Sequence, residues 1–196
     1  MNDYIICLDN GHAESTKGKC SPDKSIKEYA YTREIVRLLS EKLIKNGYKT
    51  FIVTPEVKED VSLKERCRRI NKVYKDNNKK AISISIHLNA AGNGSTWMNA
   101  RGFQVFVSPN ASKNSKRLAQ LFTKESENLN LKGNRYIPNE KYWVSNLAMC
   151  RDTNCPAVLT ENLFQDNKED VKFLLSDKGK QTIVDLHYNA IIEYLK

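Results

Sequence analysis

Short apolar runs alternate with longer segments of helical periodicity along most of the chain. Apolar runs that end in turn residues predict buried strands, and they lie at residues 4–8, 50–53, 81–86, 102–107 and 156–160. Apolar positions three or four residues apart predict helices at residues 28–44, 62–74, 115–127, 166–175 and 178–194. Strands that alternate with helices predict an α/β fold with a largely parallel sheet.

The intervening polar segments predict loops, at residues 13–27, 90–101 and 128–145. Trp97, Tyr142 and Trp143 fall in these loops, where aromatic side chains either anchor the loop on the core or pack against a ligand. A chain of 196 residues can form one sizeable core. Because no internal repeat or linker interrupts the pattern, we expect a single domain over residues 1–196.

Composition excludes several classes of protein. With 40% hydrophobic and 28% charged residues, the chain resembles a globular domain and not a disordered or collagen-like one. No apolar run approaches the roughly 18 residues that a membrane span needs, so we expect no membrane insertion. The first nine residues lack the basic and apolar regions of a signal peptide. The five cysteines are odd in number and form no C-x-x-C pair, which predicts free thiols and synthesis in the cytoplasm.

The net charge of +9 is compatible with an anionic partner, such as a cell-wall polymer. A lysine-rich surface that only keeps the protein soluble explains the same number. Nucleic-acid binding would need a recognisable module or basic residues interleaved with aromatic ones. Neither is evident, so we expect no nucleic-acid partner.

Four residues stand where chemistry is expected. His12, His87 and Glu161 follow predicted strands, and Glu28 opens a predicted helix. The carboxyl ends of parallel strands collect functional groups at one edge of a sheet. Two imidazoles and one carboxylate are the ligands of a catalytic zinc site that leaves one position for water, and a second carboxylate can move the proton. However, a single His after a strand is often structural, and a Glu at a helix start often complements the helix dipole.

Four segments, in this order and spacing, resemble the zinc-dependent N-acetylmuramoyl-L-alanine amidases of the type 3 amidase family. They are LDNGH at residues 8–12, KEY at 27–29, SIHLNA at 85–90 and PAVLTE at 156–161, the last followed by NKED at 167–170. The resemblance extends over nearly the whole chain. It implies a central mixed sheet flanked by helices on both faces.

The resemblance also implies the roles of the residues. His12, Glu28 and His87 would bind one Zn²⁺ per chain, and Glu161 would be the catalytic carboxylate. The reaction implied is hydrolysis of the amide between N-acetylmuramic acid and L-alanine in peptidoglycan. Two departures concern the first segment: the family usually has Pro at the position of Asn10, and no Gly-Gly pair follows the His. Because Asn suits turns, we expect the site to be preserved.

Other polar residues are secondary candidates. Asn89 could bind substrate or stabilise a turn, and Arg151 could pair with a stem-peptide carboxylate or form a surface salt bridge. Glu34 is the main rival of Glu28 as a ligand, although the family pattern favours Glu28. We interpret His187 as a packing or surface residue and not as a ligand.

The resemblance implies an enzyme that acts on the cell wall, with a single catalytic domain and no separate wall-binding domain. We expect it to be a monomer that is made in the cytoplasm and acts after release. A phage or prophage endolysin, a mother-cell enzyme of sporulation and an exported autolysin all fit this description. A catalytically silent basic module that binds the cell wall is the rival from another class of protein. A zinc peptidase or deacetylase that acts on another wall bond is the enzymatic rival.

Overall fold

The computed structural model describes residues 3–196 of the chain. The strands are β1 (Ile5–Asn10), β2 (Lys49–Ile52), β3 (Ala81–Asn89), β4 (Gln104–Val107), β5 (Trp143–Val144) and β6 (Ala157–Phe164). The helices are α1 (Glu28–Lys45), α2 (Leu63–Asp76), α3 (Lys113–Asn128), α4 (Ala148–Arg151), α5 (Lys168–Leu175) and α6 (Asp177–Leu195). No helix in this part of the chain has the length and apolar character needed to cross a membrane.

The described strands form one six-stranded sheet in the order β2-β1-β3-β6-β4-β5. β2, β1, β3 and β6 run parallel to one another. β4 is antiparallel to β6, and β5 pairs in parallel with β4 at the edge. The prediction of an α/β fold with a mostly parallel, mixed sheet is therefore confirmed.

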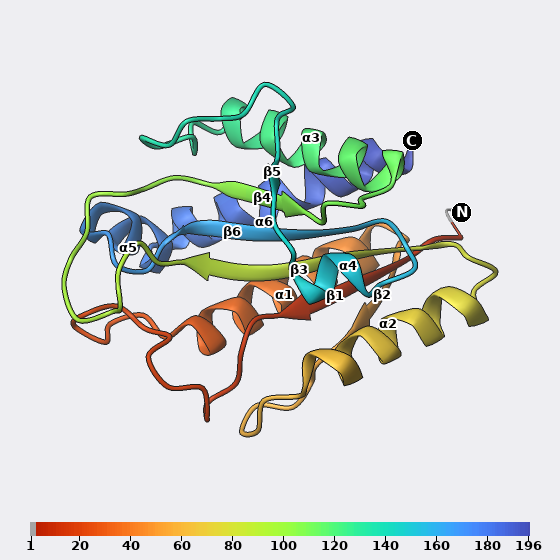
Figure 1. Cartoon of the computed structure of the whole chain (residues 1–196), viewed down its shortest axis with the longest axis horizontal. Helices are drawn as coiled ribbons and strands as arrows, with labels where there is room; N and C mark the ends of the chain where they lie inside the picture. The colour runs from red at the N-terminus through yellow and green to blue at the C-terminus, as the bar shows by residue number, and fades with distance from the viewer. Residues whose placement is uncertain (1–2) are drawn as a thin grey trace.

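Helices cover both faces of the sheet, as expected (Figure 1). Alternate residues of a strand point to opposite faces, and β3 shows the result: Ile82, Ile84 and Ile86 enter the larger core, which packs against α1, α3 and α6. Ala81 instead joins the smaller core beneath α2 and α4. Because the larger core lies on one face of β3, the strand has isoleucine at alternate positions. Ser83 and Ser85 point to the opposite face, on the side of the smaller core.

Two predicted strand ends were wrong. β3 continues to Asn89 and β6 continues to Phe164, so His87 and Glu161 lie inside strands and not after them. The two residues are register partners in the β3–β6 ladder, which becomes irregular only between His87 and Asn89. Backbone pairing between neighbouring strands continues whatever the polarity of the side chains on one face, which is why hydropathy placed both ends too early.

Two short elements were also missed, β5 inside the predicted loop 128–145 and α4 just after it. With two and four residues respectively, they are too short to produce a periodic pattern. β5 exists because Trp143 and Val144 pair with the end of β4. All five cysteines are free thiols, as predicted, and four of them are buried.

His187 lies in α6 and is completely buried, so the packing interpretation is right and the surface one is wrong. Its Nδ1 lies 2.8 Å from the carbonyl oxygen of Ile183, which can only accept a hydrogen bond. Nδ1 therefore donates, and Nε2 is left to accept from the hydroxyl of Thr160 at 3.0 Å. Burial lowers the pKa of His187 from its ordinary value of 6.5 to about 4.

This buried imidazole should make stability depend on pH. Between pH 6.5 and 4 the unfolded chain binds a proton at His187 that the folded chain rejects, so the free energy of unfolding falls as pH falls. From pH 7.5 to pH 5 we expect the wild type to lose about 2 kcal/mol more than His187→Gln. Urea unfolding of both proteins at the two pH values, with chelator present, measures this difference. Equal losses of unfolding free energy in the two proteins would contradict a buried, neutral His187.

Candidate active site

The centre of the site is the carboxylate of Glu28, at the first residue of α1. Its side chain is only 1% exposed. Oε1 lies 3.1 Å from Nδ1 of His87 and accepts a hydrogen bond from the backbone N–H of Leu88 at 3.0 Å. Oε2 is buried and has no hydrogen-bond partner. Burial raises the pKa of Glu28, but the two histidines and the hydrogen bonds outweigh burial and hold it below its usual value.

His12 lies in the loop after β1, and its backbone is left-handed, with φ of 60°. This conformation is unfavourable for a residue with a side chain, and α1 holds it in place. Thr32 donates a hydrogen bond to the carbonyl of Gly11, and Arg33 donates one to the carbonyl of His12. The Nε2 atom of His12 consequently lies 3.7 Å from Oε2 of Glu28.

His87 approaches the same point from β3, and its ring packs edge-on against the ring of His12 with the centroids 5.1 Å apart. The ring passes close to the backbone of Gly11, where a Cβ atom would lie 2.5 Å from Nδ1 of His87. Glycine at position 11 is therefore required by the close approach of a side chain. Burial lowers the pKa of His87, but the adjacent Glu28 carboxylate outweighs burial and raises it.

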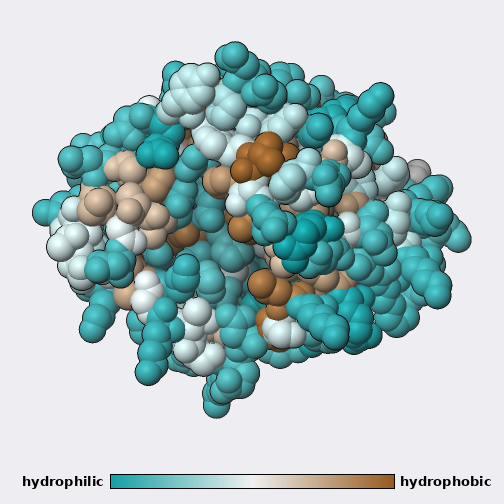
Figure 2. Space-filling model, in the orientation of Figure 1, coloured by the Kyte–Doolittle hydropathy of each residue, from teal (hydrophilic) through white to brown (hydrophobic). Residues whose placement is uncertain are grey.

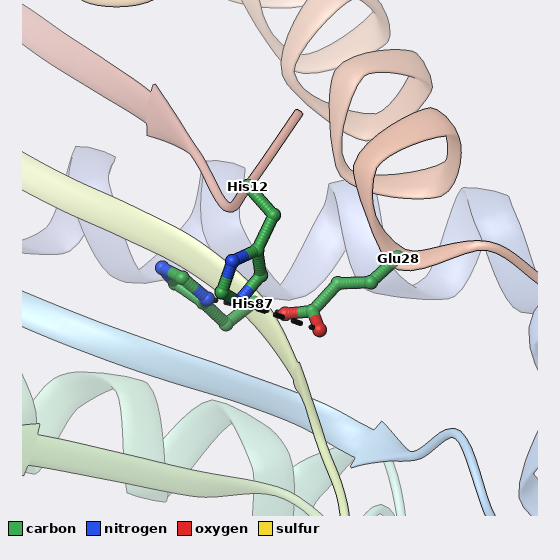
Figure 3. A group of neighbouring side chains, drawn as sticks. All are labelled: His12, Glu28 and His87. Atoms are coloured by element: carbon green, nitrogen blue, oxygen red, sulfur yellow. Dashed lines mark hydrogen bonds and ion pairs between the residues drawn. The ribbon is translucent and has the colours of Figure 1, made fainter. Parts of the chain in front are cut away.

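The three side chains come from a loop, a helix start and a strand, and they converge on one point (Figure 3). One potential ligand atom from each lies within 4.8 Å of the others, so the group could hold a metal ion. The donor set suits a metal in two further respects. Burial lowers the pKa of His12 to about 4, which keeps its ring neutral, and the unpartnered Oε2 of Glu28 is a free acceptor.

Glu161 lies beside this group without belonging to it. It faces His87 across the β3–β6 pair and Gln104 across the β4–β6 pair. Its Oε2 atom is buried and has no hydrogen-bond partner. Burial raises the pKa of Glu161 from 4.5 to about 7, the range in which a carboxyl group can both take up and release a proton near neutral pH.

A pocket of about 270 Å³ opens next to His12 and His87. Val61, Leu63 and Met149 form its apolar wall, and the space-filling view shows hydrophobic groups beside a hollow near the centre of this face (Figure 2). A ligand at the metal group would therefore have an apolar surface on one side and charged groups on the other.

Asp9, Asp60 and Arg66 form a charged wall of this pocket that was not predicted from the sequence. Arg66 is 3% exposed and donates to both carboxylates at 2.7 Å. Oδ2 of Asp60 lies 3.9 Å from Nδ1 of His12, and a carboxylate on that side favours the tautomer that leaves Nε2 free for a metal. The only signal in the sequence was the polar Asp9 at the end of a buried strand.

The secondary candidates have other contacts. Asn89 donates to Gln104 at 2.7 Å, and its Oδ1 accepts from the backbone of the next residue. Arg151 is paired with Asp152 and does not line the pocket beside His12. Glu34 is paired with Lys180 at 2.9 Å, away from the group of potential ligands. Asn10 remains in β1, where its side chain exchanges hydrogen bonds with Thr54.

The chain belongs to the N-acetylmuramoyl-L-alanine amidase family, whose model matches residues 6–193. An endolysin of Bacillus phage SPP1 is 27% identical over 191 residues, which make up 97% of this chain. The chain spans 66% of the length of that relative. The resemblance inferred from the four sequence segments is thus confirmed at the level of the family.

Solved structures show the same fold. An N-acetylmuramoyl-L-alanine amidase from Clostridium difficile 630 is 25% identical, with a TM-score of 0.80 over 100% of this chain and 98% of its own. The amidase Ami1 from Mycobacterium abscessus, in its apo form, is 18% identical with a TM-score of 0.84, and both chains are covered completely. The six-stranded sheet with helices on both faces is therefore the architecture of these amidases.

The contact between Gly11 and His87 generates a prediction. In Gly11→Ala the new methyl group must displace the His87 ring, so we expect metal affinity to fall by about tenfold or more, the effect of disturbing groups around a metal ligand. Competition with a chromophoric chelator measures the affinity. Gly92→Ala is the matched control, because its Cβ would meet the flexible side chain of Met98 at 3.3 Å and would lie in ordinary contact with Oδ2 of Asp166 at 3.6 Å. Unchanged affinity in Gly11→Ala would contradict the proposed position of His87.

Proposed function

We propose that this chain is a zinc-dependent N-acetylmuramoyl-L-alanine amidase that hydrolyses the amide between N-acetylmuramic acid and L-alanine in peptidoglycan. The observation that carries the proposal is the convergence of His12, Glu28 and His87 within 4.8 Å, with Glu161 next to them in the sheet. Membership of the amidase family supports the choice of bond. Two imidazoles and one carboxylate are a donor set of catalytic zinc sites in hydrolases.

Each residue has a distinct role in this proposal. His12, Glu28 and His87 would hold one zinc ion, which when bound would supply Lewis-acid chemistry for hydrolysis of the amide. Glu161 accepts the proton of the attacking water and delivers it to the leaving nitrogen of L-alanine. Asp60 and Arg66 support His12 from the other side, through the contacts described above.

We further propose that the chain works as a monomer on the cell wall, after synthesis in the cytoplasm and release. All three potential ligands and Glu161 come from one chain, so the site needs no residue from a second copy. The endolysin relative supports a role in wall lysis. We infer that residues 1–196 act as one catalytic domain, since a single sheet and its flanking helices supply every group of the site.

The experiment that tests the roles combines zinc content with lysis of purified sacculi. His12→Ala and His87→Ala should lose zinc and activity together, because each removes one of three ligands. Glu161→Gln should retain one zinc per chain and lose about 10²–10⁴-fold in turnover, the usual contribution of a general acid–base group. Metal analysis and turbidity loss give the two readouts.

Glu34→Gln is the matched control on α1, since Glu34 is half exposed and bound to Lys180. It should retain both zinc and activity. Substantial lysis by Glu161→Gln would refute its assigned role. If the wild type contained no zinc and bound sacculi without lysing them, the protein would instead be the silent binding module.

Product analysis separates the amidase from a zinc peptidase or deacetylase. Amidase activity releases stem peptides that begin with a free L-alanine amine and leaves the lactyl carboxylate on muramic acid. We expect mass spectrometry of digested sacculi to find both new ends. A free amine on a sugar, or a cut between two amino acids, would exclude the proposed bond.

A further inference from the structure

Most of the net positive charge lies in one short part of the chain. Residues 64–80 contain eight Lys and Arg residues against two acids, a net charge of +6 out of +9 for all 196 residues. This segment comprises nearly all of α2 and the turn that follows it. A surface that served solubility alone would distribute its lysines over several elements, so the concentration needs an explanation.

Some of these cations are used inside the protein. Arg66 is buried between Asp9 and Asp60, and Arg69 is bound to Glu56 and Glu65. The remaining cations are exposed on α2 and on the turn that follows it, and their ion pairs are with exposed or half-buried acids.

Four of the outer cations line a surface groove of about 820 Å³. They are Arg68, Lys72, Lys75 and Lys79. Arg68, Lys72 and Lys75 are spaced four and three residues apart, which places them on one side of α2, and Lys79 follows in the turn after the helix. Asp76 is the only acid among the described residues that line the groove. The surface over α2 is strongly hydrophilic in the space-filling view (Figure 2).

The groove cations are weakly neutralised. Arg68 and Lys72 form only exposed ion pairs within α2, and such pairs contribute little and exchange readily with other anions. Lys75 and Lys79 are exposed and have no ion pair with any residue between 3 and 196. Lys79 also has a left-handed backbone, with φ of 60°, directly after Asn78 with φ of 52°. The chain thus turns sharply at the end of α2 while Lys79 still lines the groove.

From these observations we infer that the groove along α2, lined by Arg68, Lys72, Lys75 and Lys79, is a docking site for an anionic phosphodiester polymer of the cell wall. The inference rests on the proposed function for the location of the partner. The groove has four cations and one acid, so its charge is complementary to a polymer with regularly spaced phosphates. Such a polymer can be bound through its charge without a pocket of defined shape. α2 begins at Leu63 in the wall of the catalytic pocket and extends about 21 Å from there, so a polymer along α2 leads toward that pocket.

Nucleic acid fits the groove less well, although it carries the same charge. Single strands are bound by aromatic side chains on which bases stack. Tyr74 is the one aromatic residue lining the groove, and it is partly buried against the smaller core. The groove therefore offers phosphate contacts and no stacking surface.

Binding of purified poly(glycerol phosphate), measured by titration at several salt concentrations, tests the inference. The wild type should bind at low salt and lose affinity steeply as salt rises. Lys75→Gln/Lys79→Gln should weaken binding at least fivefold and reduce the slope of log K against log salt by about 1 to 2. Lys113→Gln/Lys124→Gln removes the same charge from α3, outside the groove, and should change neither value.

Hydrolysis of a small soluble muramyl peptide is measured on the same proteins and should be unaffected by either pair of substitutions. If the wild type did not hydrolyse this peptide, the proposed function would be refuted. The titration would still show whether the groove binds the polymer. Equal losses in the two double variants would show that charge acts diffusely and would overturn the docking site. So would the absence of polymer binding, or tighter binding of a DNA oligonucleotide of equal charge.

Discussion

The structure of the site depends on one buried carboxylate. Glu28 is removed from water at the start of α1, and an isolated charge in that position would be strongly unfavourable. It is compensated by the backbone of Leu88, by His87 and by nearby His12. These contacts join α1 to β3 and to the loop after β1. The same carboxylate keeps one oxygen without a partner, so the group that holds the elements together also offers a position for a cation.

Alternate side chains of each strand point to opposite faces of the sheet, so core residues lie on one face and residues of the site lie on the other. Ile82, Ile84 and Ile86 of β3 enter the larger core, whereas Ser85 and His87 lie on the opposite face, where Ser85 donates to Asp9. In β6, Thr160 meets buried His187, and the next residue, Glu161, faces the site. The face of the sheet that packs into the larger core supplies most of the buried apolar surface. The opposite face is therefore free to carry ionisable groups such as His87 and Glu161.

Much of the fold and the central residues of the site could be predicted from sequence. The five longest strands and five longest helices follow from local periodicity, and the family pattern selected Glu28 instead of Glu34. Strand ends at His87 and Glu161 were placed too early, because a polar side chain resembles a terminus in hydropathy although the ladder continues. The buried Arg66–Asp9 pair was missed, since it joins two segments that are 57 residues apart through a hydrogen bond that no local pattern records.

By itself, the sequence determined the α/β class, the free thiols, and the types of residue available for chemistry, because these depend on composition and near-neighbour spacing. Only the tertiary structure decided that His12, Glu28 and His87 meet at one point and that β4 runs antiparallel to β6. It also decided that Arg68, Lys72 and Lys75 of α2 line one groove together with Lys79. These features arise from contacts between distant segments, and such contacts are determined by packing and by the compensation of buried charge.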